Sequence, residues 1–201
     1  MRTVLPDRLK LPLSFDPDRL AADLHGLKAD AWIRHFIEQN YNGDWSIIPL
    51  RGAAGASHPV LAIYADPTTT AFENTAMLAT CPYIQQLLAS FRCPLHHVRL
   101  MRLTPGSAIK EHTDHDLRYE EGMVRIHIPV VTNHGVEFLL NRSRVVLEAG
   151  SAWYLRLSDP HSVINRGDTD RVHLVIDAPV NDWIESMLRK AAEASTPPAV
   201  V

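Results

Sequence analysis

The second half of the chain is a series of short apolar runs, separated at nearly even spacing by turn-forming residues. The turns are marked at residues 105–106, 121–122, 133–135, 141–143, 149–150 and 166–168. Between them, strands are predicted near residues 95–104, 107–113, 123–131, 135–140, 143–148, 151–156, 161–165 and 171–177. Many short strands at even spacing are typical of a sandwich or a jelly-roll barrel. The chain is therefore predicted to be mainly β, with flanking helices.

The first 94 residues have a different character, and we expect a helical and irregular part that packs on the barrel. A helix is predicted to begin at Asp16, a favourable N-cap, with Pro17 in its first position. The other N-terminal predictions are a turn at 41–44, a strand at 45–50, loops at 51–59 and 66–80, and a helix at 81–91. The barrel region at 95–180 is followed by a predicted helix at 181–194 and a tail at 195–201. All of these segments form one predicted domain.

Composition excludes several classes of protein. Apolar residues make up 46% of the 201 residues and charged residues 21%, which is ordinary globular usage. The net charge of -3 gives no reason to expect a nucleic acid partner. The two cysteines cannot form a disulfide framework. No secretory signal or membrane-spanning run is visible, so no membrane partner and a cytoplasmic location are expected. The oligomeric state cannot be read from these features.

A candidate metal site begins with His112 and Asp114. Two residues apart within a strand, their side chains point to the same face. A single His-x-Asp pair is a weak signal, but His161 can add a third ligand from a later predicted strand. Two histidines and one carboxylate are the ligand set of non-haem Fe(II) oxygenases. Arg171, on the next predicted strand, can hold the far carboxylate of a 2-oxo acid co-substrate through a bidentate contact.

Alternation along two predicted strands supports an ionic interior. Arg125 and His127 share one face of their strand, opposite Ile126 and Ile128. Arg171 and His173 are likewise opposite Val172, Leu174 and Ile176. If the aliphatic faces pack against helices, the charged faces point into the barrel. A charged interior is costly unless it binds something ionic, so an anionic ligand is expected inside.

These residues resemble a known family. The segments that carry the resemblance are 112–119 (HTDHDLRY), 124–129 (VRIHIP), 161–165 (HSVIN) and 171–177 (RVHLVID). Together they are similar to the aspartyl/asparaginyl β-hydroxylase-like family, which includes free-proline hydroxylases of bacteria and lipid A-modifying hydroxylases. The resemblance covers roughly residues 95–180.

The resemblance implies a double-stranded β-helix, a cupin-like barrel, that uses Fe(II), 2-oxoglutarate and O2. It implies metal ligation by His112, Asp114 and His161. Arg171 would bind the distal carboxylate of 2-oxoglutarate, with Arg125 and His127 helping to line that pocket.

The implied activity is hydroxylation of an unactivated C–H bond, with decarboxylation of 2-oxoglutarate to succinate. The substrate would be an amino acid, an amino-acid derivative or a peptidyl residue. Arg118 and Arg102 are candidates for contacting its carboxylate, although a solvated surface position is the more common one for an arginine. Asp116 is a spare candidate for the carboxylate ligand.

Three alternatives stay open. A cupin-like hydrolase or isomerase would use Zn or Mn, with His115 or His127 as a further ligand. A non-catalytic binding barrel would keep the fold and lose the chemistry. A lipid-directed hydroxylase would carry a membrane anchor.

Overall fold

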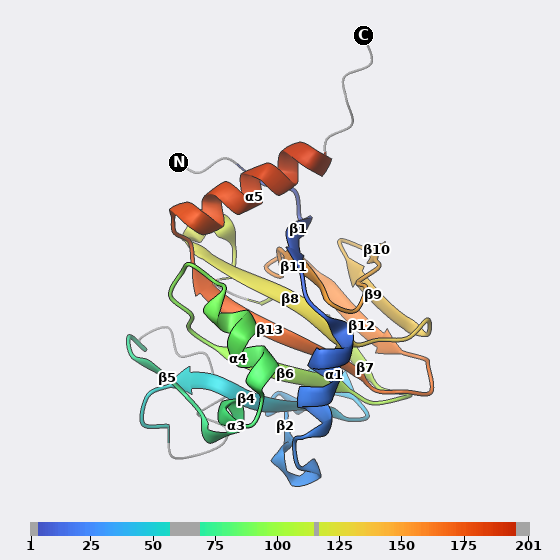
Figure 1. Ribbon diagram of the computed structural model, residues 1–201. Helices are drawn as coiled ribbons and strands as arrows, with labels where there is room; N and C mark the ends of the chain where they lie inside the picture. Colours follow the sequence, from blue (N-terminus) through green and yellow to red (C-terminus); the bar gives the residue numbers. More distant parts are fainter. Residues whose placement is uncertain (1–3, 57–68, 115–116, 196–201) are drawn as a thin grey trace.

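Two antiparallel β-sheets form the centre of the molecule in a computed structural model, which describes residues 4–56, 69–114 and 117–195 (Figure 1). The larger sheet has the strand order β1 (Arg8–Ser14), β11 (Ser151–Leu155), β8 (Met123–Val131), β13 (Arg171–Pro179), β6 (Val98–Leu103), β4 (Trp45–Ala53) and β2 (Ile33–Arg34), and β5 (Phe72–Asn74) pairs with β4. The smaller sheet has the order β10 (Ser143–Val145), β9 (Val136–Leu140), β12 (His161–Asn165), β7 (Ala108–His112) and β3 (Tyr41–Asn42). The predicted double-stranded β-helix is confirmed.

Helices cover the outer face of the larger sheet. They are α1 (Pro17–His25), α3 (Ala76–Ala79), α4 (Pro82–Ala89) and α5 (Asp182–Ser195), and short 3-10 turns occur at Ala29–Ala31, Glu38–Asn40 and Tyr119–Glu121. Asp16 caps α1 as expected, because its side chain accepts backbone hydrogen bonds from Asp18 and Arg19 at 3.0 and 3.2 Å. Buried Asp23 accepts from the backbone N–H of Ile84 at 2.7 Å, which joins α1 to the first turn of α4.

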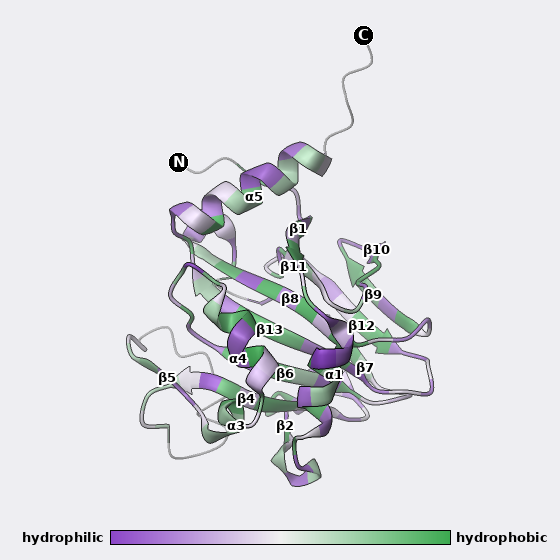
Figure 2. Cartoon of the chain, viewed as in Figure 1, coloured by the Kyte–Doolittle hydropathy of each residue, from purple (hydrophilic) through white to green (hydrophobic). Residues whose placement is uncertain are grey.

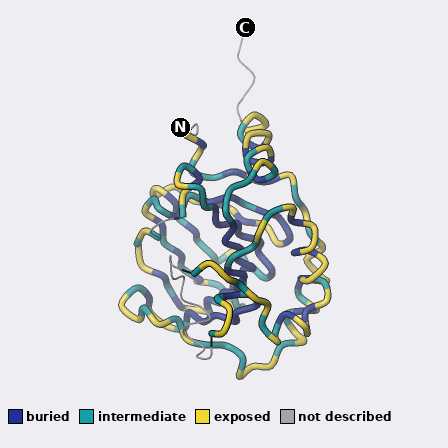
Figure 3. Tube along the Cα trace, turned by 90° about the vertical axis from the view of Figure 1, so that its left-hand side faces the viewer, coloured by how far each residue is buried: buried dark blue, intermediate teal, exposed yellow. Residues whose placement is uncertain are grey.

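The central strands separate an apolar face from a polar one. Figure 2 shows hydrophilic and hydrophobic residues alternating along β8 and β13. Ile126 and Ile128 pack in the same apolar cluster as Leu174 and Ile176, together with the buried residues of the helices. The charged and imidazole side chains of these strands therefore face the smaller sheet, as the alternation predicts. Figure 3 shows that buried residues are concentrated in the central strands.

The N-terminal part differs from the expectation of a helical and irregular layer. It supplies β1, β2 and β4 to the larger sheet and β3 to the smaller one. Sheet edges carry unpaired backbone groups, and the N-terminal strands satisfy them; β1, for example, pairs with β11 through Leu9 and Tyr154. The first 94 residues are thus part of the sheets and do more than pack against them.

Two loop predictions and one turn prediction are also corrected. Residues 51–53 continue β4, and the segment from 72 to 79 contains β5 and α3. Tyr41–Asn42 forms β3, so the turn is confined to the residues after it. There Gly43 has φ +86°, and a Cβ at this position would lie 2.2 Å from Ser107 Oγ.

Several predictions fall on residues outside the described ones. These are part of the loop at 51–59, the start of the loop at 66–80, the two alternative ligands His115 and Asp116, and the tail from 196. Among the described helices, none is both long and apolar enough to cross a membrane.

Candidate metal centre and binding cavity

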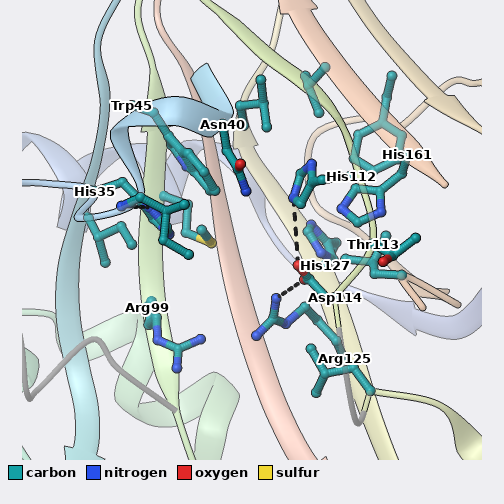
Figure 4. Close-up of a pocket in the computed structure, with 18 of the residues that line it drawn as sticks. His35, Asn40, Trp45, Arg99, His112, Thr113, Asp114, Arg125, His127 and His161 are labelled. Atoms are coloured by element: carbon teal, nitrogen blue, oxygen red, sulfur yellow. Dashed lines mark hydrogen bonds and ion pairs between the residues drawn. The ribbon is translucent and has the colours of Figure 1, made fainter. Parts of the chain in front are cut away.

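A cavity of about 270 Å³ lies between the two sheets (Figure 4). Both sheets and the N-terminal segment before β4 contribute to its wall. The lining residues that matter below are His35, Trp45, Ile47, Arg99, Met101, His112, Asp114, Arg125, His127, Phe138, His161 and Arg171. Six of the eight predicted site residues are therefore brought together in one cavity.

The predicted ligand set gathers at one side of this cavity. His112, Asp114 and His161 each offer one ligand atom, and these atoms all lie within 4.8 Å of one another. His112 ends β7 and lies directly opposite His161, the first residue of β12, with ring centroids 4.3 Å apart. Antiparallel pairing of the two strands therefore places both imidazoles at one point.

Asp114 reaches the site in a different way from the one expected. Strand β7 ends at His112, so Asp114 does not share a strand face with it. The backbone N–H of Asp114 donates to the carbonyl of Leu157 at 2.8 Å, which anchors the residue beyond the strand end. Its Oδ1 then lies 3.6 Å from His112 Nε2.

Backbone carbonyls fix the tautomer of both histidines. His112 Nδ1 lies 2.8 Å from the carbonyl oxygen of Lys110, and His161 Nδ1 lies 3.0 Å from that of Asp159. A carbonyl only accepts, so Nδ1 of each ring donates and Nε2 is the nitrogen left to ligate a metal. Metal-binding histidines have this arrangement. Burial lowers the pKa of His161 and outweighs the opposing effect of the Asp114 carboxylate. The lowered pKa favours the neutral form of His161, which is the form that can ligate a metal.

The donor set therefore fits a divalent transition-metal ion. Two imidazole nitrogens and one carboxylate lie on one side, and the open cavity is on the other (Figure 4). The described atoms that come together as ligands do not include those of His127. His127 Nδ1 is instead 3.3 Å from His173 Nδ1.

A buried ion-pair network supports the carboxylate ligand. Arg125 donates from Nη1 to Asp114 Oδ2, and its Nε and Nη2 bond both carboxylate oxygens of Asp177 at 2.6 and 2.9 Å. Burial alone raises the pKa of Asp177, but the Arg125 guanidinium, together with Arg99, outweighs burial and holds that pKa well below its usual range. Arg125 thus connects the candidate metal centre to a carboxylate that stays ionised at neutral pH.

Arg171 is a buried cation whose surroundings provide no carboxylate. Its side chain lines the cavity, and within the described chain no acidic group lies within ion-pair distance. Its Nη2 donates to His173 Nδ1 at 2.8 Å, and its Nε has no hydrogen-bond partner among the described residues. Burial lowers the pKa of Arg171 to about 9. A guanidinium is kept charged most readily by an anion, so this end of the cavity is suited to a carboxylate.

The imidazoles beside Arg171 are neutral. Burial, and then the Arg171 charge, lower the pKa values of His127 and His173 far below the ordinary value. Arg171 can only donate, so His173 Nδ1 accepts and its ring proton is on Nε2. His127 and His173 therefore add no positive charge to that of Arg171.

The two predicted substrate arginines lie elsewhere. Arg118 is half-exposed and pairs with Glu121 at 3.3 Å. Arg102 donates to Ser46 Oγ at 3.1 Å, and its guanidinium lies 4.5 Å from the ring centroid of Trp32. Neither residue lines the cavity.

Sequence reasoning missed one arginine and an aromatic wall. Arg99 lines the cavity from β6, where it shares a face with Met101 and Leu103, opposite Val98 and Leu100. The alternation of side chains along β6 places Arg99 and Arg102 on opposite faces of the strand. The sequence alone is therefore enough to separate the two arginines.

The aromatic wall comes from the N-terminal segment, in which no motif is recognisable. The His35 ring stacks on Trp45 with centroids 3.6 Å apart and an interplanar angle of 5°. Burial lowers the pKa of His35 to about 4, so the stacked ring is neutral. Figure 4 shows this stack facing the histidines of the metal centre across the cavity.

The fold is that of a double-stranded β-helix protein, and two histidines and one carboxylate come together in its cavity. The family model described as aspartyl/asparaginyl beta-hydroxylase matches residues 18–179. The chain belongs to this family, and the resemblance seen in the sequence is confirmed.

Characterised relatives are similar over most of this chain. L-proline cis-4-hydroxylase of Rhizobium meliloti (strain 1021) is 26% identical over 186 residues, which cover 92% of this chain and 65% of the relative. L-proline cis-3-hydroxylase 2 of Streptomyces sp is 26% identical over 168 residues, which cover 82% of this chain and 57% of the relative. The chain thus spans less than two thirds of the length of these curated relatives.

A solved structure supports the fold. An oxidoreductase of the 2OG-Fe(II) oxygenase family from Burkholderia pseudomallei has a TM-score of 0.59 and 16% sequence identity, covering 88% of each chain. At this level of identity the similarity establishes the fold alone.

Proposed function

We propose that this protein is an Fe(II)- and 2-oxoglutarate-dependent dioxygenase that hydroxylates an unactivated C–H bond of an amino acid or a close derivative. One observation carries the proposal. The same cavity contains the three clustered ligands and Arg171, a buried cation that has no acidic partner among the described residues. A metal centre alone is compatible with many barrels. A second, buried cation beside it is what a dicarboxylate co-substrate requires.

Each residue has a definite task in this reaction. His112 and His161 would present Nε2 to the metal, and Asp114 would add the carboxylate. Arg125 donates to Asp114 Oδ2, which would leave Oδ1 for the metal. Bound Fe(II) and 2-oxoglutarate supply the activation of O2 and the oxidation of the substrate C–H bond, with release of succinate and CO2.

Arg171 would receive the distal carboxylate of 2-oxoglutarate through two parallel hydrogen bonds. Neutral His127 and His173 flank this position without adding positive charge. The Phe138 ring, whose centroid lies 6.0 Å from the Arg171 guanidinium, would help to keep water from this ion pair.

The relatives named as L-proline hydroxylases favour a free amino acid as the first substrate to test. Purified protein is to be mixed with Fe(II) and 2-oxoglutarate without oxygen, and a weak visible charge-transfer band is expected. Succinate release is then measured in air against L-proline, other amino acids and short peptides. Absence of both the band and metal-dependent succinate release would overturn the proposal.

A further inference from the structure

We propose that His173 is a positioning residue for the co-substrate. It holds the guanidinium of Arg171 in the orientation that receives the distal carboxylate of 2-oxoglutarate, and it does so without neutralising the charge of that arginine. The inference rests on the proposed function and adds to it a residue that acts through Arg171 and does not contact the co-substrate.

A single hydrogen bond sets the orientation of Arg171. Its Nη2 donates to His173 Nδ1 at 2.8 Å, and its guanidinium forms no other hydrogen bond with the described part of the chain. The Phe138 ring, whose centroid lies 6.0 Å away, tolerates rotation of the guanidinium above it. Bidentate binding of a carboxylate requires donors that point in a fixed direction. Arg171, with its long and flexible side chain, therefore depends on His173 for that direction.

His173 is a rigid support for this contact. It is 1% exposed and shares a face of β13 with Arg171, two residues away. Its position in the sheet is opposite Met101 of β6 and Pro129 of β8. The His127 ring packs edge-on against it, with centroids 5.6 Å apart and an interplanar angle of 76°. His173 is not among the described residues that line the cavity, so its effect on a ligand passes through Arg171.

The neutral acceptor distinguishes Arg171 from the other two arginines of the cavity. Arg125 and Arg99 both donate to the Asp177 carboxylate, which offsets part of their positive charge. His173 accepts as a neutral imidazole, because burial and then the Arg171 charge hold its pKa far below the ordinary value. A neutral acceptor orients a guanidinium and leaves its charge for a ligand. A carboxylate in the place of His173 would also hold Arg171, but it would compete with the co-substrate.

The test compares two oxo acids that differ only at the end that Arg171 would bind. 2-Oxoglutarate and 2-oxopentanoate have the same oxo acid group and the same chain, but the second has a methyl group in place of the distal carboxylate. Binding of each to the Zn(II)-loaded protein is measured by calorimetry, and the readout is the ratio of the two dissociation constants. A role of His173 in the fold alone would change both constants alike and leave the ratio unchanged.

Three substitutions of His173 separate orientation from charge. His173→Leu removes the acceptor. His173→Asn keeps a neutral acceptor, because its side-chain oxygen lies as many bonds from the backbone as Nδ1 does. His173→Asp has the same shape but carries a charged acceptor. The control is His97→Leu, since His97 is also a buried imidazole and is not among the described residues that line the cavity.

Wild type and His97→Leu should bind 2-oxoglutarate about 100-fold more tightly than 2-oxopentanoate. His173→Leu should lower this ratio about tenfold, because the co-substrate must then immobilise the Arg171 side chain itself. His173→Asn should restore a ratio close to that of wild type. His173→Asp should give a lower ratio than His173→Leu, because its carboxylate occupies and neutralises the guanidinium. When Arg171→Met is already present, His173→Leu should not change the ratio further.

Four results overturn the inference. The first is a wild-type ratio in His173→Leu. The second is a ratio in His173→Asp as high as in His173→Asn; these two side chains have the same shape, so the comparison holds even if His173→Leu fails to fold. The third is an equal effect of His173→Leu with and without Arg171. The fourth is a wild type that binds both oxo acids equally. A wild type that binds neither oxo acid with Zn(II) present is a separate result, which rejects the proposed function itself.

Discussion

Arg125 and Asp177 lie directly opposite each other in neighbouring strands and form two hydrogen bonds, Nε to Oδ1 at 2.6 Å and Nη2 to Oδ2 at 2.9 Å. The pair is buried, and Asp177 also binds Arg99. One carboxylate therefore holds two cavity arginines in place, and its removal should affect both the fold and the site.

Asp177→Asn should destabilise the protein by about 3–5 kcal/mol, because two buried guanidinium groups lose their only shared carboxylate. Urea unfolding at pH 7 measures this change. Asp168→Asn, in the turn before β13, is the control and should leave the free energy of unfolding within about 0.5 kcal/mol of wild type. A loss no larger than the control's would mean that the network does not stabilise the fold.

The pH dependence of stability should also change in Asp177→Asn. The pKa of Asp177 is lowered in the folded protein, so its contribution is fully present above the unfolded-state value, near pH 4. As the pH falls below this value the contribution is lost progressively. The free energy of unfolding of wild type should therefore decrease more steeply than that of the variant between about pH 4 and pH 2. Parallel curves would contradict the assigned ionisation.

His112→Ala and His161→Ala should each abolish tight Fe(II) binding while the barrel still folds. Each removes one of the three ligands that cluster among the described residues. Calorimetric titration with Fe(II) under nitrogen measures affinity, and circular dichroism checks the fold. His134→Ala changes an exposed histidine and should bind like wild type. Full activity of either ligand variant at saturating iron would refute the ligand set.

Asp114→Ala should weaken Fe(II) binding sharply at neutral pH, because it removes the anionic member of the cluster and leaves Arg125 Nη1 without its acceptor. The same titration applies. An unchanged affinity would assign the carboxylate ligand to Asp116.

Arg171→Ala should weaken 2-oxoglutarate binding by about two to three orders of magnitude, and Arg171→Lys should restore it only in part. Fe(II) binding without co-substrate should stay near that of wild type. Arg166→Ala, an exposed arginine in the preceding turn, is the control. The sequence left open that Arg171 pairs with Asp168 or Asp170. Within the described chain Asp170 instead pairs with Arg102 at 4.0 Å, and unchanged 2-oxoglutarate affinity would favour a structural role for Arg171.

The sequence predicts the barrel well because its signals are local. Strands β8 and β12 have the predicted bounds, since apolar runs and turn residues delimit them. Period-two alternation is also local, and it oriented Arg125, His127 and Arg171 toward one interior. The position of Asp114 was harder to predict because a backbone hydrogen bond to Leu157 sets it.

The remainder depends on contacts between distant parts of the chain. Strand β1 pairs with β11, and β3 pairs with β7. Because the paired strands are far apart in the sequence, no local pattern predicts either pairing. His35 follows β2 and Trp45 begins β4, so this wall of the cavity forms when β2 pairs with β4 and β4 pairs with β6. Arg99 is different, since alternation along its own strand was sufficient to distinguish it from Arg102.

The direct pairing of His112 with His161 has a consequence for the binding and exchange of a metal ion at this site. Residues far apart in the chain are brought together by the β7–β12 ladder itself, so the entropy of closing this loop is lost on folding and not on metal binding. A preorganised site of this kind permits exchange of the ion without unfolding. The unfolded chain lacks the site, so an ion that binds there stabilises only the folded protein, by linking β7 and β12 of the smaller sheet. The melting temperature should therefore rise with the concentration of the free ion.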